Sequence, residues 1–258
     1  MRSLQLFVLF VLFSTSHLVQ ALPDELEVQL DELNRPGEYR VDVISSYTIS
    51  GSNKPAAEGL RPTFHLLQAS PDISYGITKD TQIDFQLYST VGLNGEARAD
   101  GGRIGLLTIP IRPDNEDVDG LFLGGLFEAG RLPATLSTNN LDAEFKLVLG
   151  YRTGRLTVAA NPEIGSMISG NGSSQLDSAA KFKIAYQVDP SYSLGIEHYG
   201  DLGPISHIGP LNQQSQQTFA VVDMKAKNMD LNIGIGHGWN DFSERWVVKT
   251  VVSLPLGK

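Results

Sequence analysis

Charged side chains recur at every second position in several short segments, and this spacing is the chain's clearest sign of chemistry. Lys181 and Lys183 alternate with apolar residues in KFKIAYQ, as Glu144 and Lys146 do in EFKLVLGYR. Residues two apart in an extended chain point to the same face. Opposed acids and bases on one surface can line a narrow passage and orient a charged solute. The residues assigned to a lumen-lining face are Arg40, Asp42, Asp84, Glu144, Lys146, Arg155, Lys181, Lys183, Glu197, Asp223, Lys225, Lys227, Arg245 and Lys249.

Histidines were the first candidates for catalysis. A barrel-type lipid hydrolase needs a serine nucleophile beside a histidine base, often as His-x-Ser. No histidine after residue 21 is followed two positions later by serine; the four are His65, His198, His207 and His237. We therefore predict that the chain is not an enzyme and has no catalytic residue.

Metal and cofactor sites are not indicated either. The chain has no cysteine, which excludes disulfides, thiolate metal sites and a lipid-anchoring cysteine. Glu197 and His198 are neighbours on an extended segment, so they face opposite sides and cannot share one ion. Gly124 and Gly125 lack the downstream Lys-Ser/Thr of a phosphate loop. We expect no metal and no cofactor.

The composition narrows the class of protein. The 258 residues are 41% hydrophobic and 19% charged, with 26 glycines. A net charge of −9 gives no electrostatic reason to bind nucleic acid, so no nucleic-acid partner is expected.

The N-terminus predicts export. Arg2 precedes the apolar run LQLFVLFVLF, and Val19-Gln20-Ala21 fits the small-x-small cleavage rule. Residues 1–21 are therefore interpreted as a signal peptide cleaved after Ala21. In residues 22–38, leucines at helical spacing predict a short helix in a periplasmic N-terminal segment. Whether this helix caps or plugs something is open at this point.

From Tyr39 onward the hydrophobic period is two, which predicts an all-β chain with no helix of ordinary length between the strands. The phase is ambiguous near 61–75, 97–111 and 120–130, where bulges at Pro71 and at glycines are one explanation. The predicted strands lie near 39–51, 61–75, 80–90, 97–111, 120–130, 141–152, 155–168, 178–188, 191–200, 217–227, 229–240 and 244–256.

The connections between these strands alternate in length. ITKD, RTGR, QVDPS and KNMD are tight turns, with RPDNEDVDG as the one long member of that set. Between them lie longer loops rich in Gly, Ser, Asn and Pro, among them GSNKPAAEG and TVGLNGEARADGG. Short periplasmic turns alternating with longer outer loops are typical of an up-and-down outer-membrane barrel. We predict an antiparallel transmembrane β-barrel of about twelve strands over residues 39–256.

Alternation alone does not distinguish this barrel from a soluble β-sandwich, because both have one apolar face per strand. Tyrosines and tryptophans at strand ends, such as Tyr151 and Trp246, favour a membrane interface. Charge is rare on the apolar faces, where Arg or Lys at the bilayer midplane costs about 2–4 kcal/mol. The expected partners are outer-membrane lipid and the barrel-assembly machinery. The C-terminal VVSLPLGK departs from the terminal aromatic residue that this machinery commonly reads.

Two segments carry a resemblance to a known family: YQVDPSYSLGIEHYGDLGPI (186–205) and MDLNIGIGHGWNDFSERWVVKTVVSLPL (229–256). They resemble the C-terminal half of the outer-membrane β-barrel transporter family named after the "MetA-pathway of phenol degradation". The likeness covers residues 140–256, and the front half matches only by pattern. It implies architecture and location, because its motifs belong to the barrel wall.

These observations favour a narrow channel or transporter for a small solute, in the outer membrane of a Gram-negative bacterium. One alternative is a structural or adhesive barrel whose outer loops, especially Gly200–Gln217, contact a partner. Another is a soluble periplasmic β-sandwich that binds a ligand.

Overall fold

The computed structural model describes residues 26–54, 59–114, 118–133, 135, 141–169 and 175–257. The predicted signal peptide and its cleavage site at Ala21 lie outside these residues. Within the described ranges, no helix has the length and apolar character needed to cross a bilayer.

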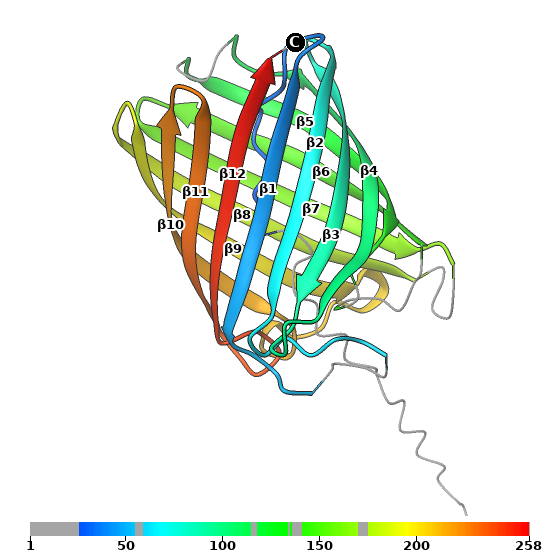
Figure 1. The fold of residues 1–258 in the computed structure, drawn as a ribbon. Helices are drawn as coiled ribbons and strands as arrows, with labels where there is room; N and C mark the ends of the chain where they lie inside the picture. Colours follow the sequence, from blue (N-terminus) through cyan, green and yellow to red (C-terminus); the bar gives the residue numbers. More distant parts are fainter. Residues whose placement is uncertain are drawn as a thin grey trace, which may run out of the picture.

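The described chain forms one closed antiparallel barrel, in which each strand pairs with its neighbours in sequence and β1 pairs with β12 (Figure 1). Two short 3-10 helices, η1 (Ile205–His207) and η2 (Leu211–Gln213), lie between β9 and β10. The strands are β1 (Tyr39–Ser50), β2 (Leu67–Thr78), β3 (Thr81–Val91), β4 (Ala97–Ile111), β5 (Gly120–Arg131), β6 (Leu141–Thr153), β7 (Leu156–Met167), β8 (Leu176–Asp189), β9 (Tyr192–Pro204), β10 (Gln216–Ala226), β11 (Met229–Gly238) and β12 (Trp246–Gly257). The predicted barrel of about twelve strands is confirmed.

The two ends of the barrel differ in their connections. One end, here called the short-turn end, has two-residue turns at 79–80, 154–155, 190–191 and 227–228, and a longer connection at 112–119. The first residue of β1 pairs with the last of β12 at this end. The opposite, long-loop end carries the connections 51–66, 92–96, 132–140, 168–175, 205–215 and 239–245. The predicted loop TVGLNGEARADGG is shorter than expected, because β4 already begins at Ala97.

The closed sheet has its apolar face outside and its polar face inside. Ile184 on β8 is 55% exposed, whereas the adjacent Lys183 is only 6% exposed. The same alternation holds on β3, where Phe85 and Leu87 are exposed and Gln86 is buried. Because the sheet closes on itself, its apolar faces do not meet in a dry centre between two layers, as a β-sandwich requires.

Register shifts between strands explain part of the ambiguity in which residues face inward. Pro71 pairs with Val43 without a shift, so the predicted bulge at Pro71 is wrong. The predicted glycine bulge does occur in β4, because Tyr88 pairs with Gly101 and the next residue of β3 pairs with Ala99. One residue of β4 is therefore left over, and the inward face changes phase at that point.

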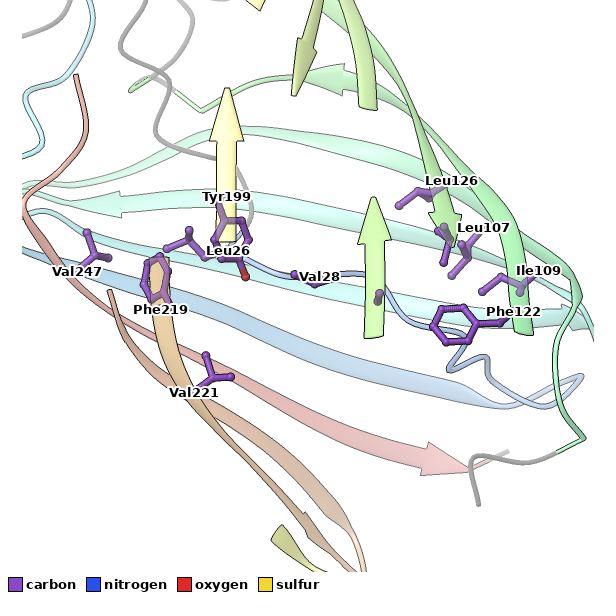
Figure 2. Packing of buried hydrophobic residues seen from close by; sticks show 12 residues of the cluster. Leu26, Val28, Leu107, Ile109, Phe122, Leu126, Tyr199, Phe219, Val221 and Val247 are labelled. Atoms are coloured by element: carbon purple, nitrogen blue, oxygen red, sulfur yellow. The ribbon is translucent and has the colours of Figure 1, made fainter. Parts of the chain in front are cut away.

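The predicted N-terminal helix is wrong for the described residues 26–38, which are irregular, with a bend at Asp31 and a turn at residues 36–37. This segment lies inside the barrel, where Leu26 and Val28 join a buried apolar cluster (Figure 2). In Figure 2, Tyr199 and Phe219 lie at one end of the cluster and Phe122 lies at the other. The barrel wall supplies hydrogen-bond partners to the segment's backbone, so the segment does not need the internal bonds of a helix.

Candidate functional site

A first ion network covers the lumen wall from β4 to β8. Lys146 Nζ lies 3.2 Å from Glu128 Oε2, 3.5 Å from Glu144 Oε1 and 3.9 Å from Glu163 Oε2. Glu163 also pairs with Lys181 at 3.2 Å. At its β4 end the network continues through an ion pair between Arg103 and Asp142. The first network thus alternates in sign around nearly half of the wall.

A second ion network lies on β8 to β12, with Glu197 at its centre. Lys183 Nζ lies 3.0 Å from Glu197 Oε1 and 2.8 Å from Asp223 Oδ1. Lys249 forms an ion pair with the other oxygen of Glu197, which also accepts a 2.6 Å hydrogen bond from Tyr199. Buried charges are tolerated only when they are paired and hydrogen-bonded. The second network meets that condition, and it fixes the inner surface of five strands.

The lumen-lining residues predicted from sequence fall into three groups. Ten of them are buried or half-buried. They face the lumen, lie where it opens at the short-turn end, or pair with residues that line it: Arg40, Asp42, Asp84, Glu144, Lys146, Lys181, Lys183, Glu197, Asp223 and Lys249. Lys225 is exposed at the end of β10 and lies 4.0 Å from Glu32. Arg155 is exposed in the β6–β7 turn and also lines the cavity described below, whereas Lys227 and Arg245 are exposed in a turn and a loop beyond the strands.

Sequence reasoning missed Arg103 and Glu128, which lie in β4 and β5. Both are buried and both belong to the first network. The glycines of these strands interrupt the apolar alternation, so their inward positions had no recognisable phase. Asn161 and Arg152 were also absent from the predicted set, because their partners belong to the segment expected to be helical.

The N-terminal segment is held in the lumen by side chains of the wall. The side-chain amide of Asn161 accepts a 2.7 Å bond from the backbone N–H of Gln29 and donates a 3.0 Å bond to its carbonyl oxygen. Lys249 Nζ donates a 2.7 Å bond to the carbonyl oxygen of Leu26. Arg152 binds both carboxylate oxygens of Asp31, one of them at 2.6 Å.

The segment continues along the barrel to the short-turn end. The backbone N–H of Asn34 donates a 3.0 Å bond to Gln82 Oε1 on β3. Beyond it, Gly76 on β2 accepts a 2.9 Å bond from the N–H of Gly37. A Cβ atom at Gly76 would overlap the carbonyl oxygen of Arg35, so only glycine permits this approach. Residues 26–34, here called the plug, therefore contact strands on several sides of the lumen.

A cavity of about 240 Å³ remains between the plug and the wall. Its lining includes Glu27 and Glu32 of the plug, and Lys183, Asp223 and Lys249 of the second network. Within the described residues, no three acidic or histidine side chains are grouped so that they could hold a metal ion. The free space of the lumen is thus a small chamber of mixed charge.

Two loops at the long-loop end are joined through Glu244, which precedes β12. Its carboxylate accepts hydrogen bonds from the hydroxyl of Thr63 and from the backbone of Ser52, both in the β1–β2 loop. Burial raises the pKa of Glu244, and these hydrogen bonds offset the rise only in part. Among the described side chains, no cation lies within ion-pair distance of Glu244.

The histidines lie at the long-loop end, in contact with other polar groups. His65 Nδ1 is 2.7 Å from the hydroxyl of Tyr47, and His198 Nδ1 is 3.0 Å from the hydroxyl of Thr218. The hydroxyl groups in these two contacts belong to tyrosine and threonine. Neither contact is the serine–histidine pair of a hydrolase.

The sequence matches no protein-family model and no curated protein. The fold is similar to that of the COG4313 outer membrane channel from Pseudomonas putida F1, with a TM-score of 0.58, 13% identity, and coverage of 90% of this chain and 100% of that chain. It is also similar to the KdgM porin (TM-score 0.53, 12% identity) and the NanC porin (TM-score 0.53, 10% identity), each covering 83% of this chain and 98% of that chain. The transporter family suggested by the two C-terminal motifs stays a prediction. At these identities the likeness establishes the fold alone: the chain has the twelve-stranded barrel fold found in outer-membrane channels and porins.

Proposed function

We propose that this protein is a narrow outer-membrane channel for a small solute, whose lumen is closed by the plug. One observation carries the proposal: an irregular N-terminal segment lies inside a barrel that is apolar outside and ionic inside. An apolar outer face suits acyl chains, and a charged inner face suits a hydrated solute. The similar fold of the channel and the two porins supports the same function.

The location follows from the same proposal. The protein would reach the outer membrane of a Gram-negative bacterium after signal cleavage at Ala21, with the short-turn end in the periplasm and the long loops outside. Its partners there would be outer-membrane lipid, the assembly machinery and the solute. Catalysis, cofactors and nucleic acid have no part in the proposed function.

The plug is bound by non-covalent contacts, so the channel can open reversibly. Its strongest polar contact with the wall is the ion pair between Asp31 and Arg152, whose guanidinium is held 5.1 Å from the ring centre of Phe122. A paired guanidinium and carboxylate with two parallel hydrogen bonds form a strong and directional contact. Opening requires this contact to break, together with the backbone bonds to Asn161 and Lys249.

Planar-bilayer recordings of the purified mature protein test the proposal. We expect infrequent, small openings in the wild type and more frequent openings in Asp31→Ala. Lys227→Ala is the control, because Lys227 is exposed in the β10–β11 turn and does not line the cavity. Absence of conductance in all three proteins, each shown to be folded by heat-modifiable migration on a gel, would reject a channel.

A second candidate function is surface binding through the β9–β10 loop. Ile205, Ile208 and Leu211 in this loop are exposed apolar residues. The loop is nevertheless ordered, because Asn240 of the β11–β12 loop donates bonds of 3.2 and 2.8 Å to the carbonyl oxygens of Leu211 and Gln214. Replacing residues 205–211 with a Gly-Ser linker should then abolish binding to cell surfaces and leave conductance unchanged.

A further inference from the structure

The wall binds the backbone of the plug directly, in addition to contacting its side chains. Four backbone groups of the plug are bound by wall side chains: the carbonyl of Leu26, both the N–H and the carbonyl of Gln29, and the N–H of Asn34. The amide of Asn161 binds Gln29 as a neighbouring β-strand would, with one bond accepted and one donated. Any extended peptide presents the same groups, whatever its side chains.

Side chains of the plug are bound as well. The Asn34 side-chain amide donates a 2.8 Å bond to Ser74 Oγ, and the most buried of these contacts is that of Asp31. Arg152 grips the carboxylate of Asp31 with two nitrogens, and both residues are buried. The guanidinium lies against the ring of Phe122, which fixes its position when the carboxylate is absent. This position of the wall therefore selects an acidic group at a set distance along the backbone from the Asn161 contact.

The residues that bind the plug are deeply buried. Asn161 is fully buried and Lys249 is 1% exposed. A buried amide or charge costs free energy when its partner leaves, so the wall favours an occupant that restores the same hydrogen bonds. A second peptide satisfies this demand, whereas an ion or a sugar does not present alternating N–H and C=O groups.

We propose that the lumen contains a binding track for short non-helical peptides with an acidic side chain, and that residues 26–34 occupy it as an internal competitor. The track is formed by Asn161, Arg152, Lys249 and Gln82. The proposal rests on the proposed function, which gives solutes access to the lumen. It deepens that function by naming the solute class as acidic peptides. The plug is tethered, so its effective concentration at the track is in the millimolar range, and free peptide competes poorly with it.

The test is calorimetric titration of the full-length mature protein in detergent with the acetylated, amidated nonapeptide Leu-Glu-Val-Gln-Leu-Asp-Glu-Leu-Asn. Asp31→Ala weakens the internal competitor and leaves the track intact. We expect this variant to bind the peptide at least about tenfold more tightly than the wild type does. Equal or absent binding in both proteins overturns the proposal.

Two altered peptides examine what is recognised without altering the protein. Methylation of the backbone nitrogen at the fourth residue, Gln, removes the N–H that Asn161 accepts and should weaken binding about tenfold. Replacement of the sixth residue, Asp, with Asn should weaken binding at least as much. Equal affinity of the N-methylated and parent peptides would show that the backbone is not recognised.

A wall variant completes the comparison. In Asp31→Ala/Asn161→Ala, the parent and N-methylated peptides should bind equally, because the partner of that N–H is gone. A difference that persists would place the recognised contact elsewhere and contradict the track. The bilayer recordings separate this proposal from the channel: peptide binding without conductance rejects only the channel, and conductance without peptide binding rejects only the track.

Discussion

Asp31 and Arg152 lie 121 residues apart in the sequence, yet the two terminal nitrogens of Arg152, Nη1 and Nη2, both bind the carboxylate of Asp31 inside the barrel. The pair joins the plug to β6. It is surrounded by buried groups, so the loss of one partner leaves an uncompensated charge.

Reversal of this ion pair should separate its effect from that of either side chain. Asp31→Arg or Arg152→Asp alone places like charges together, and breaking a buried pair costs about 3–5 kcal/mol. We expect the plug to be exposed on the order of a hundredfold more often in each single variant than in the wild type. In the double variant, the frequency of exposure should return toward the wild-type level. The chain has no cysteine, so the maleimide labelling rate of Val28→Cys in each background measures this exposure. Labelling of the double variant as fast as that of the single variants would contradict a direct pair.

Lys249 supports both the second network and the plug. Lys249→Met leaves Glu197 with one cation fewer and removes the bond to Leu26, so the free energy of unfolding should fall by about 3–5 kcal/mol. Lys225→Met is the control, because the Lys225 side chain is 49% exposed and its pair with Glu32 is 4.0 Å long. It should change stability by less than about 1 kcal/mol. Urea unfolding in detergent measures both, and equal losses would assign the effect to net charge instead of burial.

Gly76 allows the chain to enter the barrel beside β2. Gly76→Ala places a methyl group against the carbonyl oxygen of Arg35, and such overpacking costs about 1–3 kcal/mol. We expect faster amide hydrogen exchange in residues 35–38, measured by mass spectrometry. Gly165→Ala is the matched control, because its added methyl group meets its nearest neighbour at 3.5 Å, an ordinary contact. Unchanged exchange in Gly76→Ala would show that the close approach is not needed for docking.

The Glu244 contact between the β1–β2 and β11–β12 loops should depend on pH. Burial raises the pKa of Glu244 in the folded state, so the carboxyl group binds its proton more tightly folded than unfolded. Its contribution therefore favours the closed loops at low pH, and the loops loosen as pH rises above the ordinary glutamate range toward the raised pKa. We expect protease cleavage in residues 239–245 to accelerate as pH rises, and Glu244→Gln to abolish this dependence. Cleavage that slows with rising pH would contradict this prediction, because a raised pKa of Glu244 requires the loops to loosen as pH rises.

The sequence predicted the barrel well because its evidence is local. Phe145 and Lys146 face opposite sides in any extended strand, and a strand in lipid must keep the charged side inward. Connection lengths are also visible in the sequence, including the exception at 112–119.

The site was harder to predict because its contacts are not local. Leu26, Leu30 and Leu33 have helical spacing, but Leu26 and Val28 are also two apart and both face the buried cluster. No pattern within residues 22–38 shows that the wall will supply their hydrogen bonds. Arg103 was missed for a different reason, because the leftover residue of β4 near Gly101 shifts the phase of its inward face.

The bond from Lys249 to the carbonyl of Leu26 spans 223 residues, from the last strand to the first described residue. During synthesis the plug is made first, but its binding partner on β12 is made last. The plug therefore acquires its full set of contacts only after the residues of β12 have been made. Complete docking of the plug thus follows the synthesis of the last strand.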